Sequence, residues 1–151
     1  MNQKRISVVV PTLNEEGNVG ELIERTHKAL TEHGFVYELI FIDDFSTDST
    51  REIINSYSQS YPVSVHLKQG PKGKAKSLLQ GFALAKYEYT AMLDADLQYA
   101  PEEIPPMFEK LANGSDIVQS KRVNHKENFI RRFLSKGFSF VFVRILHGLK
   151  F

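Results

Sequence analysis

Met92-Leu93-Asp94-Ala95-Asp96-Leu97-Gln98 is the stretch around which the predicted fold is organised, because an apolar run ends there at two carboxylates one residue apart. Neighbouring carboxylates repel each other and lose hydration when buried, so they are kept where water, a donor or a cation compensates them. The stretch therefore has two interpretations. It is either a strand end followed by a turn, where Asp is common for local hydrogen bonding, or a site for a divalent metal ion.

The composition is that of one globular domain. The chain has 151 residues, of which 42% are hydrophobic and 25% charged, which is enough to form a core. It has no cysteine, which excludes disulfides and thiolate metal sites and fits a reducing compartment. The apolar run at residues 6–10 is too short for a secretory signal, so we expect a cytoplasmic location.

Apolar runs alternate with amphipathic segments over residues 6–93. Strands are predicted at residues 6–10, ending at Pro11, and at 37–42, 63–67 and 89–93. Capping boxes predict helix starts at Asn18 and Ser49, and Gly34 is expected to end the first helix. This alternation predicts βαβ units with right-handed crossovers and a mostly parallel sheet, which is an α/β fold.

Apolar residues at helical spacing mark three helices. They are Val19, Leu22, Ile23, Thr26, Ala29 and Leu30 in the first helix, Ile53, Ile54 and Tyr57 on the predicted buried side of the second, and Ala75, Leu78, Leu79, Phe82 and Ala83 in the third.

Acidic residues follow three of the four predicted strands. In open parallel sheets, ligands bind beyond the carboxyl ends of the strands, near the switch in strand order. The acids expected at that edge are Glu15, Asp43, Asp44, Asp94 and Asp96. So many carboxylates at one edge favour a metal or ligand site over turn chemistry alone.

Known nucleotide-binding motifs are absent from the chain. No G-x-G-x-x-G follows the first strand, and Gly70-Pro71-Lys72-Gly73-Lys74-Ala75-Lys76-Ser77 has the wrong glycine spacing for a P-loop. Its glycines, its lysines and the helix start behind it would nevertheless suit a phosphate. The alternative is a flexible basic surface loop.

Four motifs in sequence order resemble those of family 2 glycosyltransferases with the GT-A fold. They are Pro11-Thr12-Leu13-Asn14-Glu15, Asp43-Asp44-Phe45-Ser46-Thr47-Asp48-Ser49-Thr50, Gly73-Lys74 with Gly81-Phe82, and Asp94-Ala95-Asp96-Leu97-Gln98-Tyr99-Ala100-Pro101-Glu102-Glu103-Ile104-Pro105. The resemblance covers nearly the whole chain and is strongest to the branch that uses polyprenyl phosphates. It implies a Rossmann-like, mostly parallel sheet flanked by helices.

The resemblance also implies roles for individual residues. A nucleotide-diphosphate sugar, UDP- or GDP-linked, would lie across the carboxyl edge with Mg²⁺ or Mn²⁺ on its diphosphate, and oxygen ligands suit these hard ions. Asp94 and Asp96 are the implied catalytic residues, and together with Gln98 they are the implied metal ligands. The implied nucleotide-binding residues are Pro11, Thr12, Leu13, Glu15, Lys74 and one of Asp43 and Asp44, the choice between these two remaining open.

The implied reaction is metal-dependent, inverting transfer of the sugar to a polyprenyl phosphate or a related membrane glycan. A phosphate acceptor is already anionic, whereas a sugar hydroxyl needs a general base, and no convincing base follows Asp116. Arg122, Arg131 and Arg132 are the candidate contacts for the acceptor or a phosphate. Because relatives continue where this sequence stops, the alternative is a catalytically incomplete nucleotide-sugar-binding fragment or assembly module.

Charge divides the chain into two parts. Residues 121–151 carry a net charge of +7 and the remaining 120 residues carry −6. We therefore distinguish a nucleotide-sugar-binding core, residues 1–120, from a basic, aromatic-rich tail, residues 121–151, in the same domain. The tail is predicted to be helical, and its lysines and arginines argue against a bilayer span.

Two roles are open for this tail. It could lie on the cytoplasmic face of a membrane, where each basic residue contributes about 1 kcal/mol near anionic lipids. It could instead cover the sheet and meet a second subunit in a homo-oligomer. Nucleic acid is not an expected partner.

Overall fold

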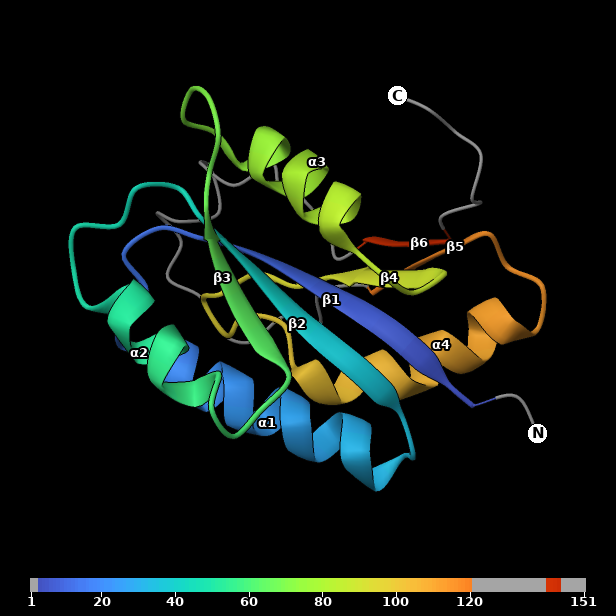
Figure 1. Ribbon diagram of the computed structural model, residues 1–151. Helices are drawn as coiled ribbons and strands as arrows, with labels where there is room; N and C mark the ends of the chain where they lie inside the picture. Colours follow the sequence, from blue (N-terminus) through green and yellow to red (C-terminus); the bar gives the residue numbers. More distant parts are fainter. Residues whose placement is uncertain (1–2, 121–140, 145–151) are drawn as a thin grey trace, which may run out of the picture.

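The computed structural model describes residues 3–120 and 141–144 (Figure 1). Their elements in chain order are β1 (Arg5–Thr12), α1 (Val19–Glu32), β2 (Val36–Asp43), α2 (Thr50–Tyr57), β3 (Val63–Leu67), α3 (Lys74–Leu84), β4 (Tyr89–Met92), the 3₁₀ turn η1 (Pro101–Glu103), α4 (Ile104–Ala112), β5 (Ile117–Gln119) and β6 (Val141–Arg144). Within the described residues the strand order is β3-β2-β1-β4-β6-β5. The pairs among β1 to β4 are parallel, and β6 is antiparallel to both of its neighbours. The predicted α/β class with a mostly parallel sheet is confirmed.

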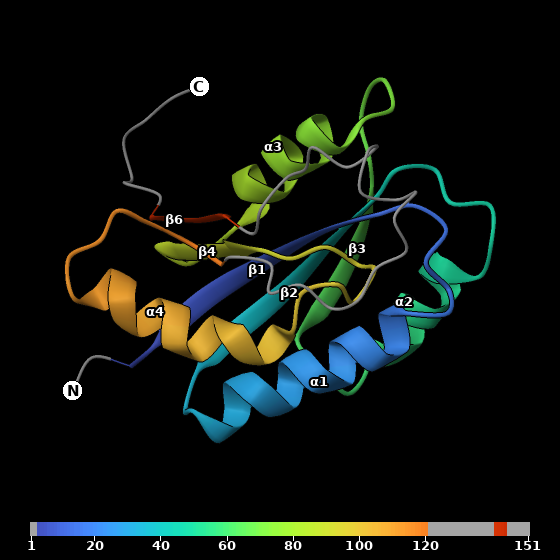
Figure 2. The same ribbon diagram turned by 180° about the vertical axis from the view of Figure 1, so that it is seen from behind.

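Helices cover both faces of the sheet. Figures 1 and 2 show α1, α2 and α4 on one face and α3 on the other. Ile6, Val8 and Val10 of β1 are fully buried in the core under α1 and α4, whereas Val9 packs with Leu78 of α3. The continuous apolar run of β1 is therefore explained by burial on both of its faces.

Gly81 allows α3 to approach the sheet closely. A Cβ atom at this position would lie 2.2 Å from Val9 Cγ1 and 3.3 Å from Ile42 Cγ1. Any larger residue would push α3 away from β1 and β2, because buried atoms cannot overlap. The Gly81 of the third motif thus has a packing role.

The predicted first strand was too short at its C-terminal end. β1 continues through Pro11, which lies opposite Ile42 of β2, and ends at Thr12. Pairing with β4 extends only to Val9, so Pro11 lies where β1 has a strand partner on one side. Proline is tolerated at such positions, because the ladder there does not need its missing donor.

Both predicted capping boxes are wrong, although the helices start where expected. Asn18 precedes α1 without a side-chain cap bond, and its Nδ2 donates instead to Glu15 Oε2 at 2.7 Å. Ser49 precedes α2 and also makes no cap bond. The C-terminal prediction is confirmed, because α1 is followed by Gly34 with φ of 74°.

The residues that mark the helices are buried or packed against the core in α1 and α2, and only in part in α3. All six such residues of α1 are its buried residues. In α2, Ile54 is buried, and Ile53 and Tyr57 pack against the core. In α3, Leu78 is buried and Phe82 packs against it, whereas Ala75, Leu79 and Ala83 are exposed. Ser77 and Gly81 are the other buried residues of this helix. α3 contacts the sheet through a narrower stripe than the apolar pattern indicated.

The sequence interpretation missed η1, α4, β5 and β6. Val141–Arg144 form a strand, which corrects the prediction of a wholly helical tail over residues 121–151. A short apolar run cannot be assigned to a helix or a strand by periodicity alone, and pairing with β4 and β5 decides it here. The rest of that predicted tail lies outside the described residues. None of the described helices has the length and apolar character needed to cross a membrane.

Candidate active site at the carboxyl edge of the sheet

A cleft of about 520 Å³ lies at the carboxyl edge, where the chain passes from β1 to β2 on one side and later to β4 on the other. This is the switch in strand order at which parallel sheets bind ligands. The cleft is lined by Pro11, Thr12, Leu13, Glu15, Asp44, Lys72, Gly73, Lys74, Ser77, Asp94, Ala95 and Asp96. Of the predicted site residues on described segments, Asp43 and Gln98 alone are not part of this lining.

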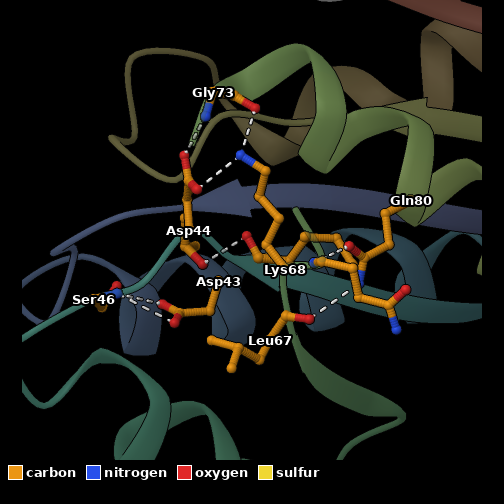
Figure 3. Close-up of polar contacts among 10 residues, drawn as sticks. Asp43, Asp44, Ser46, Leu67, Lys68, Gly73 and Gln80 are labelled. Carbon is orange, nitrogen blue, oxygen red and sulfur yellow. Dashed lines mark hydrogen bonds and ion pairs between the residues drawn. The ribbon is translucent and has the colours of Figure 1, made fainter. Parts of the chain in front are cut away.

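The structure separates the two acids that the sequence could not distinguish. Asp43 is fully buried, and both of its oxygens accept from the Ser46 N–H, at 3.2 and 3.3 Å. Asp44 lies next to it and lines the cleft (Figure 3). Successive side chains at a strand end point in opposite directions, so Asp43 stabilises the turn and Asp44 faces the cleft.

Asp44 is held from inside the protein by Lys68. The Lys68 ammonium, with a fully buried side chain, donates to Asp44 Oδ1 at 2.8 Å and to the Gly73 carbonyl at 2.9 Å. The Gly73 N–H donates to Asp44 Oδ2 at 2.8 Å (Figure 3). Burial raises the pKa of Asp44, but the hydrogen bonds from Lys68 and Gly73 outweigh it and lower that pKa below its ordinary value. Asp44 therefore remains an anion in the cleft.

Sequence reasoning missed Lys68. A lysine after a strand is ordinarily expected at the surface, so its residue type gave no signal of burial. Gln80 of α3 was also missed. Its side chain accepts from the Gln69 N–H at 2.8 Å and donates to the Leu67 carbonyl at 3.1 Å, which ties the segment after β3 to α3 (Figure 3).

The stretch Met92–Gln98 shows features of both a turn and a possible metal site. Asp96 Oδ1 accepts from the Gln98 N–H at 3.1 Å, with Leu97 at φ of 56°, which is turn chemistry. Asp94 Oδ1 is buried without a hydrogen-bond donor in suitable geometry, and the Lys74 ammonium lies 2.6 Å from it. Both carboxylates line the cleft, with the buried Ala95 between them.

The loops after β1 and β2 are joined by a set of hydrogen bonds. The Glu15 N–H donates to Thr50 Oγ1 at 2.8 Å, and Thr50 Oγ1 donates to Asp48 Oδ1 at 2.6 Å. Asn14 accepts from the Thr47 N–H at 2.8 Å. These hydrogen bonds therefore fix the two loops beside the cleft. Pro11, Leu13 and Glu15 line the cleft itself.

The residues present fit a divalent cation that is shared with a ligand. The described part of the chain has no group of three or more His, Cys, Asp or Glu side chains that could enclose an ion. Mg²⁺, however, is commonly bound by one or two carboxylates together with substrate phosphates. Asp94 and Asp96 would supply the carboxylates, and both line the cleft, where Asp94 Oδ1 is buried and paired with the Lys74 ammonium at 2.6 Å.

The remaining predicted contacts, Arg122, Arg131 and Arg132, lie outside the described residues.

Comparisons with known proteins agree with this geometry. The family model described as "Glycosyl transferase family 2" matches residues 7–150. Dolichol-phosphate mannosyltransferase of Pyrococcus furiosus is 39% identical over 138 residues, which cover 88% of this chain and 39% of that protein. Undecaprenyl-phosphate 4-deoxy-4-formamido-L-arabinose transferase of Salmonella paratyphi B is 37% identical over 136 residues, with 88% and 41% covered. The chain thus spans about two fifths of the length of these relatives.

A solved structure supports the same assignment. Glucosyl-3-phosphoglycerate synthase of Mycobacterium tuberculosis, in complex with Mn²⁺, UDP and phosphoglyceric acid, is 26% identical with a TM-score of 0.64, over 77% of this chain and 42% of that one. Such structural neighbours have the GT-A fold, which confirms the fold expected from the motifs. By its motifs, its fold and the extent of the family match, the chain belongs to glycosyl transferase family 2.

Proposed function

We propose that the cleft binds a nucleotide-diphosphate sugar, UDP- or GDP-linked, with Mg²⁺ or Mn²⁺, and that the enzyme transfers the sugar with inversion to a polyprenyl phosphate. The observation that carries this proposal is that one cleft contains Asp44, Lys74, Asp94 and Asp96 at the switch in strand order. The names of the two curated relatives specify dolichol phosphate and undecaprenyl phosphate, and the solved neighbour holds Mn²⁺ and UDP.

Different residues of the cleft are proposed to bind the nucleoside and the diphosphate of the donor. Asp44, kept ionised by Lys68, accepts hydrogen bonds from the nucleoside. Lys72 and Lys74 attract the diphosphate, and Asp94 and Asp96 hold the cation on it. The cation supplies neutralisation of the charge on the departing nucleoside diphosphate.

The acceptor phosphate needs no base among these residues. Its anionic oxygen forms a bond to the anomeric carbon, and the electron pair of the broken bond leaves with the nucleoside diphosphate. Attack opposite the leaving group inverts the configuration. Arg122, Arg131 and Arg132 are proposed to hold the acceptor phosphate or the donor diphosphate.

The tail, residues 121–151, is proposed to bring the enzyme to the cytoplasmic face of a membrane. Its net charge of +7 favours anionic lipids, where the polyprenyl phosphate resides. Alternatively, the apolar residues of the tail pack against a second subunit and form a homo-oligomer.

Titration calorimetry tests donor binding. We expect UDP or GDP to bind the native chain at least about tenfold more tightly with Mn²⁺ than without it, within the usual range of coupling between ligands. Asp96→Ala should lose this metal dependence, because it removes one cleft carboxylate. The exposed Asp116 lies outside the cleft lining, so Asp116→Ala is the matched control and should behave as the native chain does. A nucleotide affinity that is the same with and without Mn²⁺ would contradict the proposal.

A transfer assay separates the enzyme from the binding fragment. Radiolabelled nucleotide sugars would be incubated with a short polyprenyl phosphate, and the organic phase counted. Sugar in that phase, absent with Asp96→Ala, supports transfer. Metal-dependent binding without transfer supports the incomplete module instead.

A further inference from the structure

The segment Gly73–Lys74 contacts two carboxylates that line the cleft, Asp44 and Asp94. The Gly73 backbone is fixed to Asp44 and Lys68 by its N–H and its carbonyl, at 2.8 and 2.9 Å (Figure 3). The next residue, Lys74, places its ammonium 2.6 Å from Asp94 Oδ1. The Gly73 backbone thus contacts Asp44, the proposed nucleoside-binding residue. The Lys74 side chain contacts Asp94, a proposed ligand of the cation.

The Lys74 ammonium takes the position of a counter-ion for Asp94. The carboxylate is about four-fifths buried, and its Oδ1 has no hydrogen-bond donor in suitable geometry. A buried carboxylate needs a compensating positive charge, and Lys74 supplies it. Asp94 is therefore already neutralised before a metal ion arrives.

A divalent cation on the same carboxylate conflicts with this ion pair. Mg²⁺ binds carboxylate oxygens at about 2.1 Å, so it would lie within a few ångströms of an ammonium 2.6 Å from Asp94 Oδ1. Repulsion between the two cations is strong at such separations, because the cleft wall lowers the effective dielectric constant. For a cation to bind tightly, the ammonium must move away.

The side chain of Lys74 can move without the backbone. Its backbone opens α3 directly behind the anchored Gly73, whereas its side chain is 39% exposed on a flexible four-carbon stem. A diphosphate in the cleft offers the ammonium a second anion. The same diphosphate offers the cation additional oxygen ligands.

From these contacts we infer that Lys74 pairs with Asp94 until a diphosphate binds, and so makes cation binding conditional on a diphosphate. The inference rests on the proposed function and concerns how that site is regulated. The diphosphate withdraws Lys74 from Asp94, and the exposed carboxylate then takes the metal ion. By linkage, the cation strengthens nucleotide binding by the same factor.

Direct Mn²⁺ titration, followed by electron paramagnetic resonance, tests the inference without an activity assay. Lys74→Met should bind Mn²⁺ alone at least about fivefold more tightly than the native chain. The factor by which UDP or GDP strengthens Mn²⁺ binding should fall about fivefold as well, since part of that coupling is lost with the lysine. Lys74→Arg keeps a positive charge and should stay within about twofold of the native chain.

Lys76→Met is the matched control, because Lys76 is an exposed lysine of the same helix outside the cleft lining. It should leave both quantities unchanged. Thermal unfolding of each variant establishes that it is folded. If Mn²⁺ binds Lys74→Met and the native chain equally, the inference is wrong while the proposed function stands. If no combination of Mn²⁺ and nucleotide binds the native chain, both fail.

Discussion

Lys68 illustrates how a single buried charge organises the candidate site. Its ammonium is enclosed by Asp44 and the Gly73 carbonyl, and its own N–H donates to the Asp43 carbonyl at 2.9 Å. Removing one partner of a buried ion pair leaves the other without compensation. The residue therefore influences both the stability of the fold and the orientation of Asp44.

Lys68→Met should lower the free energy of unfolding by roughly 2 kcal/mol, measured by urea denaturation. A fully buried pair costs about 3–5 kcal/mol to break, and the smaller value applies because Asp44 lines an open cleft where water can reach it. Adding Asp44→Asn should recover part of the loss, since the uncompensated carboxylate is then removed.

Lys86→Met is the control for this pair. Lys86 also forms an ion pair, at 3.2 Å with Glu38, but its side chain is 77% exposed. Exposed pairs contribute less than about 1 kcal/mol, so this variant should be much milder. Equal losses in the two variants would contradict the role assigned to Lys68.

The lowered pKa of Asp44 also predicts a dependence of stability on pH. Because the folded state lowers this pKa, the carboxylate stabilises the fold above its ordinary pKa, and the contribution is lost as the pH falls through the folded value. Between about pH 5 and pH 3 the native chain should lose more unfolding free energy than Asp44→Asn does. Asp116→Asn should follow the native curve. Parallel curves for the native chain and Asp44→Asn would show that Asp44 contributes nothing to this loss.

At the scale of elements, apolar periodicity predicted the positions of strands and helices well, whereas local sequence motifs predicted the helix-capping hydrogen bonds poorly. The strands β1 to β4 and the buried face of α1 follow from apolar patterning, because burial on the sheet requires it. The capping boxes failed because other partners satisfy these groups. The Asn18 side chain donates to Glu15, three residues before it, and the Ser49 N–H, which a capping box would pair with Glu52, donates to Glu16 of the loop after β1. A local motif cannot reveal a competing partner about 33 residues away.

Two neighbouring substitutions at the start of α2 test this difference. Thr50→Val should cost about 1–3 kcal/mol of unfolding free energy, because the Glu15 N–H loses its acceptor beside a fully buried residue. Ser49→Ala should cost less than about 0.5 kcal/mol, because Ser49 makes no cap bond. A working capping box predicts a loss of about 1 kcal/mol at Ser49 instead. Urea denaturation of both variants distinguishes the two cases.

For the whole molecule, the sequence predicted the edge at which the site lies but not how its charges are paired. The alternation of strands and helices placed Glu15, Asp44, Asp94 and Asp96 at one carboxyl edge, and the cleft lining agrees. The separation of Asp43 from Asp44 depends on the turn at Phe45, with φ of 66°, and on bonds to Ser46. The pairing of β6 with β4 joins segments about fifty residues apart, which patterning cannot detect.

Since segments around β1, β2, α3 and β4 all line the cleft, a ligand bound there should stabilise the entire fold. At a free concentration of about 100 times its dissociation constant, GDP or UDP with Mn²⁺ should add about 2.7 kcal/mol to the free energy of unfolding. For a chain of this size, calorimetric melting should then show a Tm roughly 8 °C higher. Asp96→Ala should lose the part of the shift that needs Mn²⁺, because it removes a cleft carboxylate, and Asp116→Ala should keep it. An equal Mn²⁺-dependent shift in Asp96→Ala would place the cation elsewhere on the protein and leave the cleft without its proposed role.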